Sequence, residues 1–202
     1  MENEVMLHIV DLNDYPDFDI DSLSYVTKED MMEAKRYKQL QDLQQHLVSQ
    51  YFKRKYVPDF YNLPSGKPIS HTKCFNISHS HNLIIYAEAD VNVGIDIELV
   101  KKSDDRIRKY ISNDNEFEFI KTDEDFYRIW TSKESLVKCY GSGIVDDVKS
   151  IPAIPINGRK FYKEEKFYTR NLKYNDFILS ITINKDEYFE INFIEEELEF
   201  NK

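Results

Sequence analysis

Alternating apolar and polar positions predict several β-strands in this chain of 202 residues. The clearest alternation covers residues 91–99, where every second side chain is apolar and Asp96 and Glu98 share the opposite face. Residues two apart on a strand point their side chains to the same face, so both carboxylates leave the same side of the predicted strand. Further strands are predicted at residues 5–10, 74–78, 83–89, 161–171, 176–184 and 187–194.

Apolar residues at three- and four-residue steps predict the helices. Thr27 is a suitable N-cap for one long amphipathic helix over residues 28–52. A charged, helix-prone region covers residues 103–121, and a stronger helix begins near residue 123 and ends at Gly141, a natural C-terminal stop. Strands thus precede and follow the helices, which predicts an α+β fold of two α/β-type halves that meet near residue 101.

The charge of the chain changes sign along its length. Lys and Arg number 27 and Asp and Glu 37, and a net charge of −10 argues against a general binder of nucleic acid or anionic membranes. Residues 1–30 carry a net charge of −8 and residues 186–202 carry −6, so the middle of the chain carries +4. The acidic segment 195–199 is expected to be a solvated end.

The composition and the first residues of the chain exclude further classes of protein. The aromatic content of 14% excludes a disordered chain. Residues 1–4 lack a basic segment followed by an apolar run, and no stretch of about 18 apolar residues occurs, so a cytoplasmic protein is expected. Cys74 and Cys139 stand far apart without ligand spacing, which indicates reduced thiols.

Asp96 and Glu98 are candidates for binding a hard cation. Their carboxylates would lie about 6–7 Å apart along the strand, and such a pair leaves Mg²⁺ several positions for water or substrate phosphate. The alternative is an ordinary solvent-facing strand. Gly94 favours the site, because a strand glycine often allows a ligand or another backbone to come close.

The later helix carries a second candidate group. Trp130, Glu134 and Lys138 stand at i, i+4 and i+8 and share one helix face. Either Glu134 and Lys138 form a surface pair worth about 0.2–0.5 kcal/mol, or Glu134 is a metal ligand or general base and Lys138 binds phosphate. His79 follows a strand and is either structural or a phosphate-binding or proton-transferring residue, because no third nitrogen or sulfur ligand suggests zinc.

Four ordered motifs resemble those of the 4′-phosphopantetheinyl transferases of the Sfp-like type. They are Gly66-Lys67-Pro68, Phe75-Asn76-Ile77-Ser78-His79-Ser80, Gly94-Ile95-Asp96-Ile97-Glu98, and Trp130-Thr131-Ser132-Lys133-Glu134-Ser135 followed by Lys138 and Gly141-Ser142-Gly143. The resemblance implies a pseudo-dimer of two similar halves, residues 1–101 and 102–202, with mainly antiparallel sheets packed on helices and the active site in the cleft between them. It also implies Mg²⁺-dependent transfer of the 4′-phosphopantetheine arm from coenzyme A to a serine of an apo acyl or peptidyl carrier protein, releasing adenosine 3′,5′-bisphosphate.

The resemblance also assigns residues. It implies metal binding by Asp96, Glu98 and Glu134, and coenzyme A binding by Lys67, Ser78, His79, Lys133 and Lys138. Catalytic roles fall to Glu134, Lys138 and His79, with Glu134 or a metal-bound water as the base. The expected partners are coenzyme A and the carrier protein, without nucleic acid or membrane, and the protein is expected to be a monomer.

Several positions depart from the family pattern. His81 stands where the family often has glycine, and Gln44-Gln45-His46 stands where it commonly has an arginine for the 3′-phosphate of coenzyme A. Lys35, Arg36, Lys38 and His46 are the candidate replacements, and Glu116 matches a family glutamate only with one residue inserted. Two other functions therefore remain open: a non-catalytic protein of this fold that binds coenzyme A or a carrier, and a Mg²⁺ phosphohydrolase.

Overall fold

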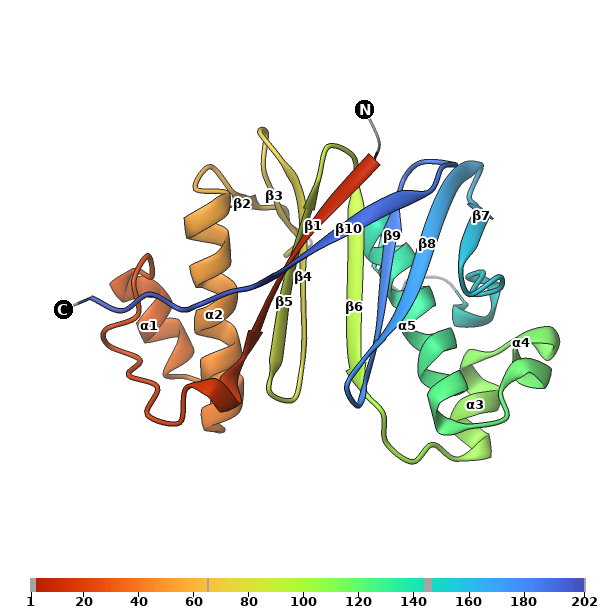
Figure 1. Ribbon diagram of the computed structural model, residues 1–202, viewed down its shortest axis with the longest axis horizontal. Helices are drawn as coiled ribbons and strands as arrows, with labels where there is room; N and C mark the ends of the chain where they lie inside the picture. The colour runs from red at the N-terminus through yellow and green to blue at the C-terminus, as the bar shows by residue number, and fades with distance from the viewer. Residues whose placement is uncertain (1–2, 65, 144–146, 202) are drawn as a thin grey trace.

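The computed structural model of the chain describes residues 3–64, 66–143 and 147–201, so Ser65 of the motif-bearing turn lies outside the described residues. Two four-stranded sheets dominate the molecule (Figure 1). The first consists, in spatial order, of β10 (Phe189–Glu195), β1 (Asn3–Asp11), β5 (Leu83–Ala89) and β4 (Cys74–Ser80). The second consists of β6 (Val93–Leu99), β9 (Phe177–Ile183), β8 (Glu165–Tyr174) and β7 (Gly158–Tyr162). A small hairpin pairs β2 (Tyr61–Asn62) with β3 (Pro68–Ile69).

Each four-stranded sheet has its own helices (Figure 1). The first sheet is accompanied by α1 (Lys28–Ala34) and α2 (Leu40–Tyr56), and the second by α5 (Asp123–Tyr140) with α3 (Asp105–Ile111) and α4 (Asp114–Phe119) beyond it. Short 3₁₀ turns occur at η1 (Leu12–Asp14) and η2 (Val148–Ser150). The predicted α5 is confirmed: Thr122 forms a capping box with Asp125, and Gly141 ends the helix at φ +95°.

The pairing of strands confirms the α+β class with mainly antiparallel sheets. All ladders of the two large sheets are antiparallel except that between β1 and β10, which is parallel. Each sheet also contains a strand from the other side of residue 101, because β6 pairs with β9 and β10 pairs with β1. The division into residues 1–101 and 102–202, and the pseudo-dimer, stay predictions.

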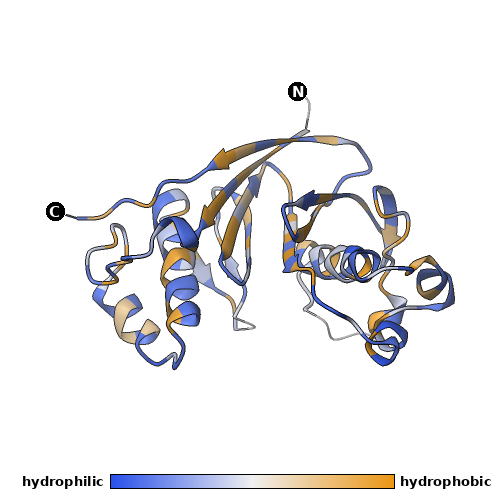
Figure 2. Cartoon of the chain, turned by 60° about the horizontal axis from the view of Figure 1, so that its bottom comes forward, coloured by the Kyte–Doolittle hydropathy of each residue, from blue (hydrophilic) through white to orange (hydrophobic). Residues whose placement is uncertain are grey.

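Three apolar cores hold the layers together. One contains residues of both large sheets and so joins them, one joins α2 to the first sheet, and one surrounds α5. In Figure 2, hydrophobic residues run along the strands while much of the helical surface is hydrophilic. In the part of the chain that the structure describes, the helices are all too short or too polar to span a membrane.

Helix α5 packs on the second sheet through small hydroxyl residues. Thr131 bonds to Ser180 at 2.8 Å, Ser135 bonds to Thr182 at 2.8 Å, and all four residues are fully buried. Short side chains that satisfy each other allow the helix backbone to come close to the sheet without leaving buried polar groups unpaired. This close packing fixes the position of the helix that carries Glu134 and Lys138.

The prediction of a single helix over residues 28–52 was wrong, because the chain breaks between α1 and α2. Asp30, buried in the capping box of α1, accepts hydrogen bonds from Arg54 near the end of α2, with Nε 2.6 Å from Oδ2. This ion pair requires α1 to fold back along α2, which one straight helix does not allow. Leu40 is 64% exposed at the start of α2, whereas Leu43 and Leu47 of the same helix are buried.

The single strand predicted over residues 161–171 is also wrong, because it contains the turn of the β7–β8 hairpin. Lys163 and Glu164 both have positive φ, of 47° and 67°, and form that turn. Positive φ at both central positions is typical of the tight turns that match strand twist, but Lys and Glu are not residues that signal such a turn. Because apolar and polar residues alternate on both sides of the turn, the sequence pattern reads as one continuous strand.

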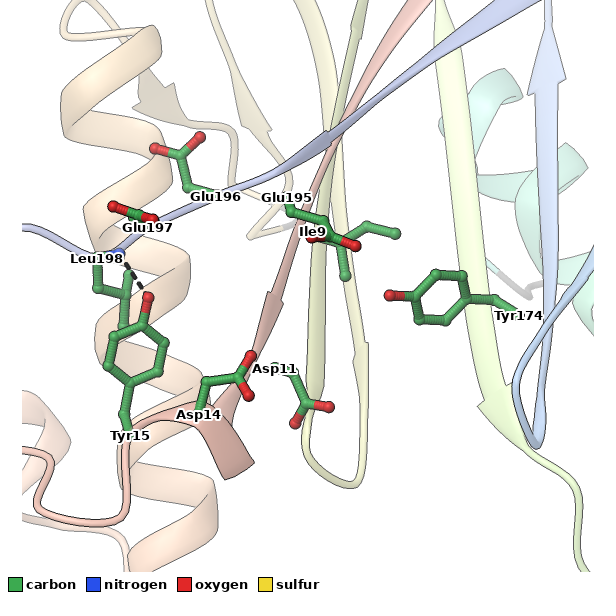
Figure 3. Close-up of a pocket in the computed structure, with 9 residues that line it drawn as sticks. All are labelled: Ile9, Asp11, Asp14, Tyr15, Tyr174, Glu195, Glu196, Glu197 and Leu198. Carbon is green, nitrogen blue, oxygen red and sulfur yellow. Dashed lines mark hydrogen bonds between the residues drawn. The ribbon is translucent and has the colours of Figure 1, made fainter.

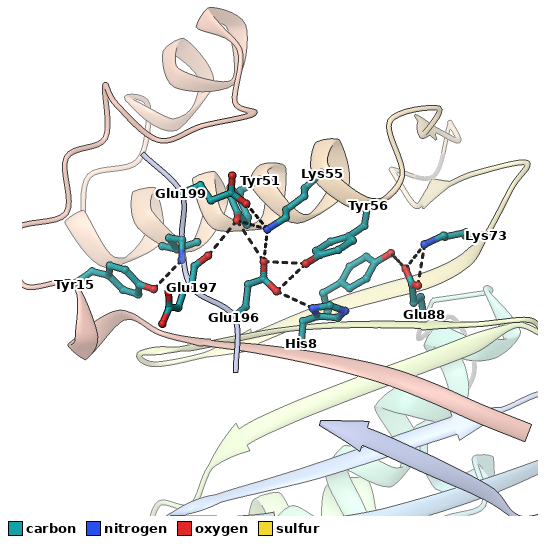
Figure 4. A network of polar contacts seen from close by, with 12 residues as sticks. His8, Tyr15, Tyr51, Lys55, Tyr56, Lys73, Glu88, Glu196, Glu197 and Glu199 are labelled. Carbon is teal, nitrogen blue, oxygen red and sulfur yellow. Dashed lines mark hydrogen bonds and ion pairs between the residues drawn. The ribbon is translucent and has the colours of Figure 1, made fainter. Parts of the chain in front are cut away.

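The acidic segment after β10 is not simply a solvated end, so that prediction needs correction. The Glu196 side chain is 6% exposed, and its carboxylate lies 2.7 Å from Lys55 Nζ and 2.9 Å from His8 Nδ1. Tyr56 also donates to it at 2.8 Å (Figure 4). Leu198, two residues later, is buried against residues of α2 and β1. Glu196 thus fixes the end of the chain to the rest of the protein. Its carboxylate is buried because three donors, one from β1 and two from α2, bond to it.

Candidate active site

The two large sheets meet at the edge strands β4 and β6, and side chains make the hydrogen bonds between them. Each of these strands lies at the edge of its sheet and, among the described residues, pairs with one neighbouring strand of that sheet. Alternate residues of β4 instead reach across to β6. The contacts are Asn76 Oδ1 accepting from Ile95 N (3.1 Å), Ser78 Oγ donating to Asp96 Oδ1 (3.1 Å), Ser80 Oγ donating to Glu98 Oε2 (2.9 Å) and Leu99 N donating to Ser80 Oγ (3.1 Å). We call Asn76, Ser78 and Ser80 with these partners the β4–β6 seam.

Helix α5 reaches the seam because Gly94 has no side chain. A Cβ at Gly94 would lie 2.0 Å from the Ser135 carbonyl oxygen and 2.3 Å from the Cys139 backbone nitrogen. Such distances are impossible, so any other residue would push the helix away. The strand glycine therefore admits another backbone, which is one of the two alternatives that the sequence left open. Lys138 of α5 consequently lies with its Nζ 2.6 Å from Asp96 Oδ1.

Three carboxylates and one ammonium group share this junction. Burial is the main cause that raises the pKa of Asp96, Glu98 and Glu134. The Asp96 charge raises the pKa of both glutamates further, whereas Lys138 lowers the pKa of all three. A site that disfavours three negative charges in this way stabilises a bound cation. Asp96, Glu98, Glu134 and Lys138 are therefore near enough to affect one another's charge, and only Lys138 and Asp96 are in direct contact.

The donor set suits a hard divalent ion. Asp96 Oδ2 is buried and has no hydrogen-bond partner among the described residues, so this oxygen is available to a ligand. Carboxylate oxygens are the ligands that Mg²⁺ prefers. Within residues 3–64, 66–143 and 147–201, no three His, Cys, Asp or Glu side chains stand in a metal-holding arrangement, and the Lys138 ammonium lies against the other Asp96 oxygen. The types of donor suit Mg²⁺, but the described carboxylates do not stand in a ligating arrangement, so the metal stays a prediction.

Three predicted coenzyme A residues surround this cluster. Ser78 is buried and lies between Asp96 and Lys138, whose Nζ donates to its Oγ at 3.2 Å. His79, the next residue of β4, is exposed, and desolvation by its surroundings followed by repulsion from Lys138 lowers its pKa. Lys67 Nζ donates to the Lys138 carbonyl at 3.1 Å, where a cation complements the C-terminal end of α5.

The structure does not bring Lys133 to the cluster. Its side chain is fully buried on the other side of α5, with Nζ 2.7 Å from Glu116 Oε2 and within 2.9 Å of the carbonyls of Val148 and Ile151. These acceptors use all three ammonium protons. Lys133 therefore ties α5 to α4 and to the segment around η2, and Glu116 is its counter-ion rather than a ligand in the cleft. One helical step of 100° separates this position from Glu134.

The structure also accounts for the departures from the family pattern. His81 has φ +58° in the turn between β4 and β5, a conformation that favours glycine but that histidine adopts more readily than most residues. Gln45 is buried and donates to the His81 carbonyl at 2.6 Å, so it supports the turn next to His79. His46 lies 3.9 Å from Glu33 and 5.3 Å from the Tyr37 ring, and burial lowers its pKa.

Asn76, Ser80 and Trp130 belong to the site, although sequence reasoning gave them no role. Trp130 is one of the hydrogen-bond partners that lower the pKa of Glu98. The signal for the other two was present: Asn76, Ser78 and Ser80 repeat at steps of two and lie 18 or 19 residues before their partners on β6. Equal offsets along two neighbouring strands indicate that they run side by side, but an alternation alone does not say which strands face each other.

A larger cavity lies away from this cluster. It has a volume of about 570 Å³ and is formed by residues of β1, the η1 region, the end of β8, and the end of β10 with the segment after it (Figure 3). Its lining contains five carboxylates and no basic residue: Asp11, Asp14, Glu195, Glu196 and Glu197. An acidic lining repels a polyanion such as coenzyme A, so cavity size does not point to the active site here.

Fold and site together define an α+β protein with an acidic cluster and a lysine at the junction of two sheets. Comparison with known proteins agrees with the four motifs. The family model of the 4′-phosphopantetheinyl transferase superfamily matches residues 92–187. The chain is thus similar to this superfamily over just under half of its length.

Curated relatives have the same activity in their names. The chain is 29% identical to the 4′-phosphopantetheinyl transferase gsp of Aneurinibacillus migulanus over 187 residues, covering 83% of this chain and 73% of the relative. It is 28% identical to psf-1 of Bacillus pumilus over 148 residues, 64% of each chain. It is 37% identical to Sfp of Bacillus subtilis over 76 residues, 35% of this chain and 34% of the relative. The Sfp-like resemblance of the motifs is thereby confirmed.

Proposed function

We propose that this enzyme transfers the 4′-phosphopantetheine arm of coenzyme A to a serine of an apo carrier protein and releases adenosine 3′,5′-bisphosphate. The names of the relatives and the four motifs support the reaction. The single observation that carries it lies at the β4–β6 seam, where Lys138 contacts Asp96 and its charge also acts on Glu98 and Glu134. Carboxylates for a metal next to a lysine for phosphate are the parts that phosphoryl transfer requires.

Mg²⁺ is the proposed metal, held by Asp96, Glu98 and Glu134. When bound, it would neutralise negative charge on the diphosphate and on the departing phosphate. The raised pKa values of the three carboxyl groups and the unpartnered Asp96 Oδ2 support this assignment.

Glu134 and Lys138 perform the proposed chemical step. The serine oxygen bonds to the phosphorus that carries the pantetheine arm, and the bond from that phosphorus to the bridging oxygen breaks, so the electron pair leaves with the adenosine bisphosphate. Glu134 accepts the serine proton, directly or through a water, and its raised pKa suits a general base. Lys138 stabilises the charge that moves onto the leaving phosphate.

Lys67, Ser78 and His79 are the proposed contacts for coenzyme A. Their positions around Lys138 support this role, because Lys67 and Ser78 both bond to Lys138 and the exposed His79 follows Ser78 on β4. Lys133 is not included, since its ammonium is buried and fully paired.

The acceptor protein is proposed to bind over α3 and α5. A cavity of about 410 Å³ begins at Glu98 and continues along apolar side chains of these two helices. Ile107 and Tyr110 of α3 are 41% and 70% exposed at this cavity. A carrier that places apolar side chains near its serine would bury them here while the serine lies at the carboxylate cluster. Which pathway the carrier serves, fatty-acid, polyketide or peptide synthesis, is a question for the experiment.

Mass spectrometry tests the function directly. Purified protein is incubated with Mg²⁺, coenzyme A and a panel of apo carriers, and one carrier is expected to gain the mass of one phosphopantetheine arm. The same mixture without Mg²⁺ is expected to give no product. Binding of coenzyme A without a mass gain on any carrier would instead support the non-catalytic alternative, and release of inorganic phosphate the phosphohydrolase. The cytoplasmic location and the monomeric state stay predictions.

A further inference from the structure

Two hydrogen bonds from β4 hold the backbone on either side of the metal-binding segment of β6. An edge strand exposes unpaired backbone N–H groups, and those of Ile95 and Leu99 are satisfied by Asn76 Oδ1 and Ser80 Oγ. Ile95 directly precedes Asp96, and Leu99 directly follows Glu98. The segment that carries both carboxylates is therefore fixed at its two ends by side chains of the opposite sheet.

Ser80 makes the more specific of these contacts. Its Oγ accepts the Leu99 N–H at 3.1 Å and lies 2.9 Å from Glu98 Oε2. A backbone N–H only donates, so the hydroxyl proton of Ser80 is free to point at Glu98. One hydroxyl thus holds both the Glu98 carboxylate and the backbone next to it.

We propose that Ser80, supported by Asn76, is a positioning residue that aims Glu98 at a divalent cation. Ser80 acts through Glu98, and this role rests on the proposed function only in its choice of metal. Partners that hold the ligands of a metal ion commonly change its affinity 10–100-fold when they are removed. Ser78 differs from Ser80 because it also contacts Lys138, so its replacement would change two groups at once.

Direct metal binding tests the role without any turnover. Mn²⁺, as a spectroscopic probe for Mg²⁺, is titrated into the full chain in the absence of coenzyme A and carrier, and its affinity is measured by electron paramagnetic resonance. Ser80→Ala is expected to weaken binding about 10-fold or more, whereas Ser80→Thr, which keeps the hydroxyl, is expected to bind like the parent. Hydrogen exchange of the Leu99 amide is expected to speed up in Ser80→Ala only.

Ser70→Ala is a matched control. Ser70 also donates its hydroxyl to a carboxylate, that of Asp59 at 2.8 Å, but Asp59 precedes β2 and Ser70 follows β3, so neither belongs to the β4–β6 seam. Its removal is expected to leave Mn²⁺ affinity unchanged. If Ser80→Ala does not fold by circular dichroism, Ser80→Cys keeps the volume with a much weaker donor and is expected to show the same loss of affinity.

Unchanged Mn²⁺ affinity in a folded Ser80→Ala or Ser80→Cys variant would overturn the positioning role, as would a parent protein that binds no Mn²⁺. The transfer assay distinguishes this from a failure of the proposed function. A parent that modifies no carrier but loses Mn²⁺ affinity on Ser80→Ala would keep the positioning role and remove the transferase. If the parent modifies a carrier and Ser80→Ala keeps the parent's Mn²⁺ affinity, the transferase function would stand and the positioning role of Ser80 would be removed.

Discussion

Lys133 and Lys138 lie on the same helix, α5, but their side chains have different surroundings. Lys138 is 30% exposed and faces Asp96 at the junction of the sheets, whereas Lys133 is fully buried against Glu116. The first has a neighbour with which incoming phosphate can compete, and the second has all its protons engaged. At the scale of single residues, burial and partners decide whether a lysine binds a ligand or supports the fold.

Replacing Lys133 is expected to reduce mainly the stability of the protein, and replacing Lys138 is expected to reduce mainly its transfer activity. Lys133→Met leaves Glu116 buried without a cation, which is expected to lower the free energy of unfolding by about 3–5 kcal/mol. Lys138→Met is expected to abolish transfer with a smaller loss of stability, because this ammonium is partly solvated. Urea unfolding and the carrier mass assay measure both quantities. Equal stability of the two variants would contradict the assignment of Lys133.

Glu134→Gln is expected to slow transfer about 100-fold or more, because the amide cannot accept the serine proton. The change keeps the shape of the side chain, so circular dichroism and binding of coenzyme A are expected to match the parent. Steady-state turnover with a carrier that the parent modifies is the measurement. Turnover within the parent's range would remove Glu134 as the base.

Close packing of α5 on β6 is the feature that matters at the scale of elements. Gly94 brings the helix backbone against the strand, and the buried hydroxyl pairs with β9 keep it there. This contact sets the distance between Glu134 on the helix and Asp96 on the strand. The candidate site is thus a property of the helix–strand contact and not of either element.

Gly94→Ala is expected to lower stability by about 3 kcal/mol, because its methyl group would overlap two backbone atoms of α5. Gly66→Ala is the comparison: apart from its chain neighbours, no atom of the described residues lies within 4 Å of its Cβ position, and its φ of +84° leaves a conformational cost of about 1 kcal/mol. Thermal and urea unfolding report both values. A Gly94→Ala variant as stable as Gly66→Ala would show that α5 does not need the close approach.

A negative charge placed on α3 is expected to weaken binding of the carrier protein without changing binding of coenzyme A. Ile107→Glu places a carboxylate in the apolar cavity next to Glu98, and the KM for the carrier is expected to rise about 10-fold while the KM for coenzyme A is unchanged. Phe161→Glu, at a residue of β7 that is 65% exposed, is the control and is expected to change neither value. An unchanged KM for the carrier in Ile107→Glu would place acceptor binding elsewhere.

At the scale of the whole molecule, the strand exchange ties the two sheets together. Strand β10 returns to pair with β1, and the following residues cross α2, where Glu196 meets His8, Lys55 and Tyr56 (Figure 4). Residues near the two ends of the described chain thereby close one layer. Loss of this contact is expected to affect the stability of both sheets rather than one helix.

Glu196→Gln tests this anchor through its pH dependence. Burial raises the pKa of Glu196, but hydrogen bonds from Lys55, His8 and Tyr56 outweigh it and leave the pKa below its ordinary value. A lowered pKa gives stability that is present above the unfolded pKa and is lost as pH falls through the folded one. The parent is therefore expected to exceed the variant by about 2 kcal/mol near neutral pH, with the difference shrinking below about pH 4.5.

Glu197→Gln is the control for this measurement, since Glu197 is the exposed neighbour in the same segment. It is expected to match the parent at each pH of a urea unfolding series. A stability difference between parent and Glu196→Gln that stays constant down to pH 3 would show that the carboxylate charge is not what the anchor uses.

The sequence by itself determined the local features of this protein. Periodicity placed most strands and α5, because side-chain direction repeats with each element's own geometry. Motif spacing put Asp96 with Glu98, and Glu134 with Lys138, for the same reason. Turn chemistry was less informative: Lys163 and Glu164 adopt positive φ because the hairpin requires it, although neither residue signals a turn.

Only the tertiary structure decided which elements meet. The exchange of β6 and β10 between sheets, the turn of α1 against α2, the burial of Glu196 and the seam between β4 and β6 all join residues far apart in the sequence. Such contacts depend on partners that local pattern does not specify. The division of labour between Lys133 and Lys138 follows from them, because the surroundings of a helix face are set by what packs on it.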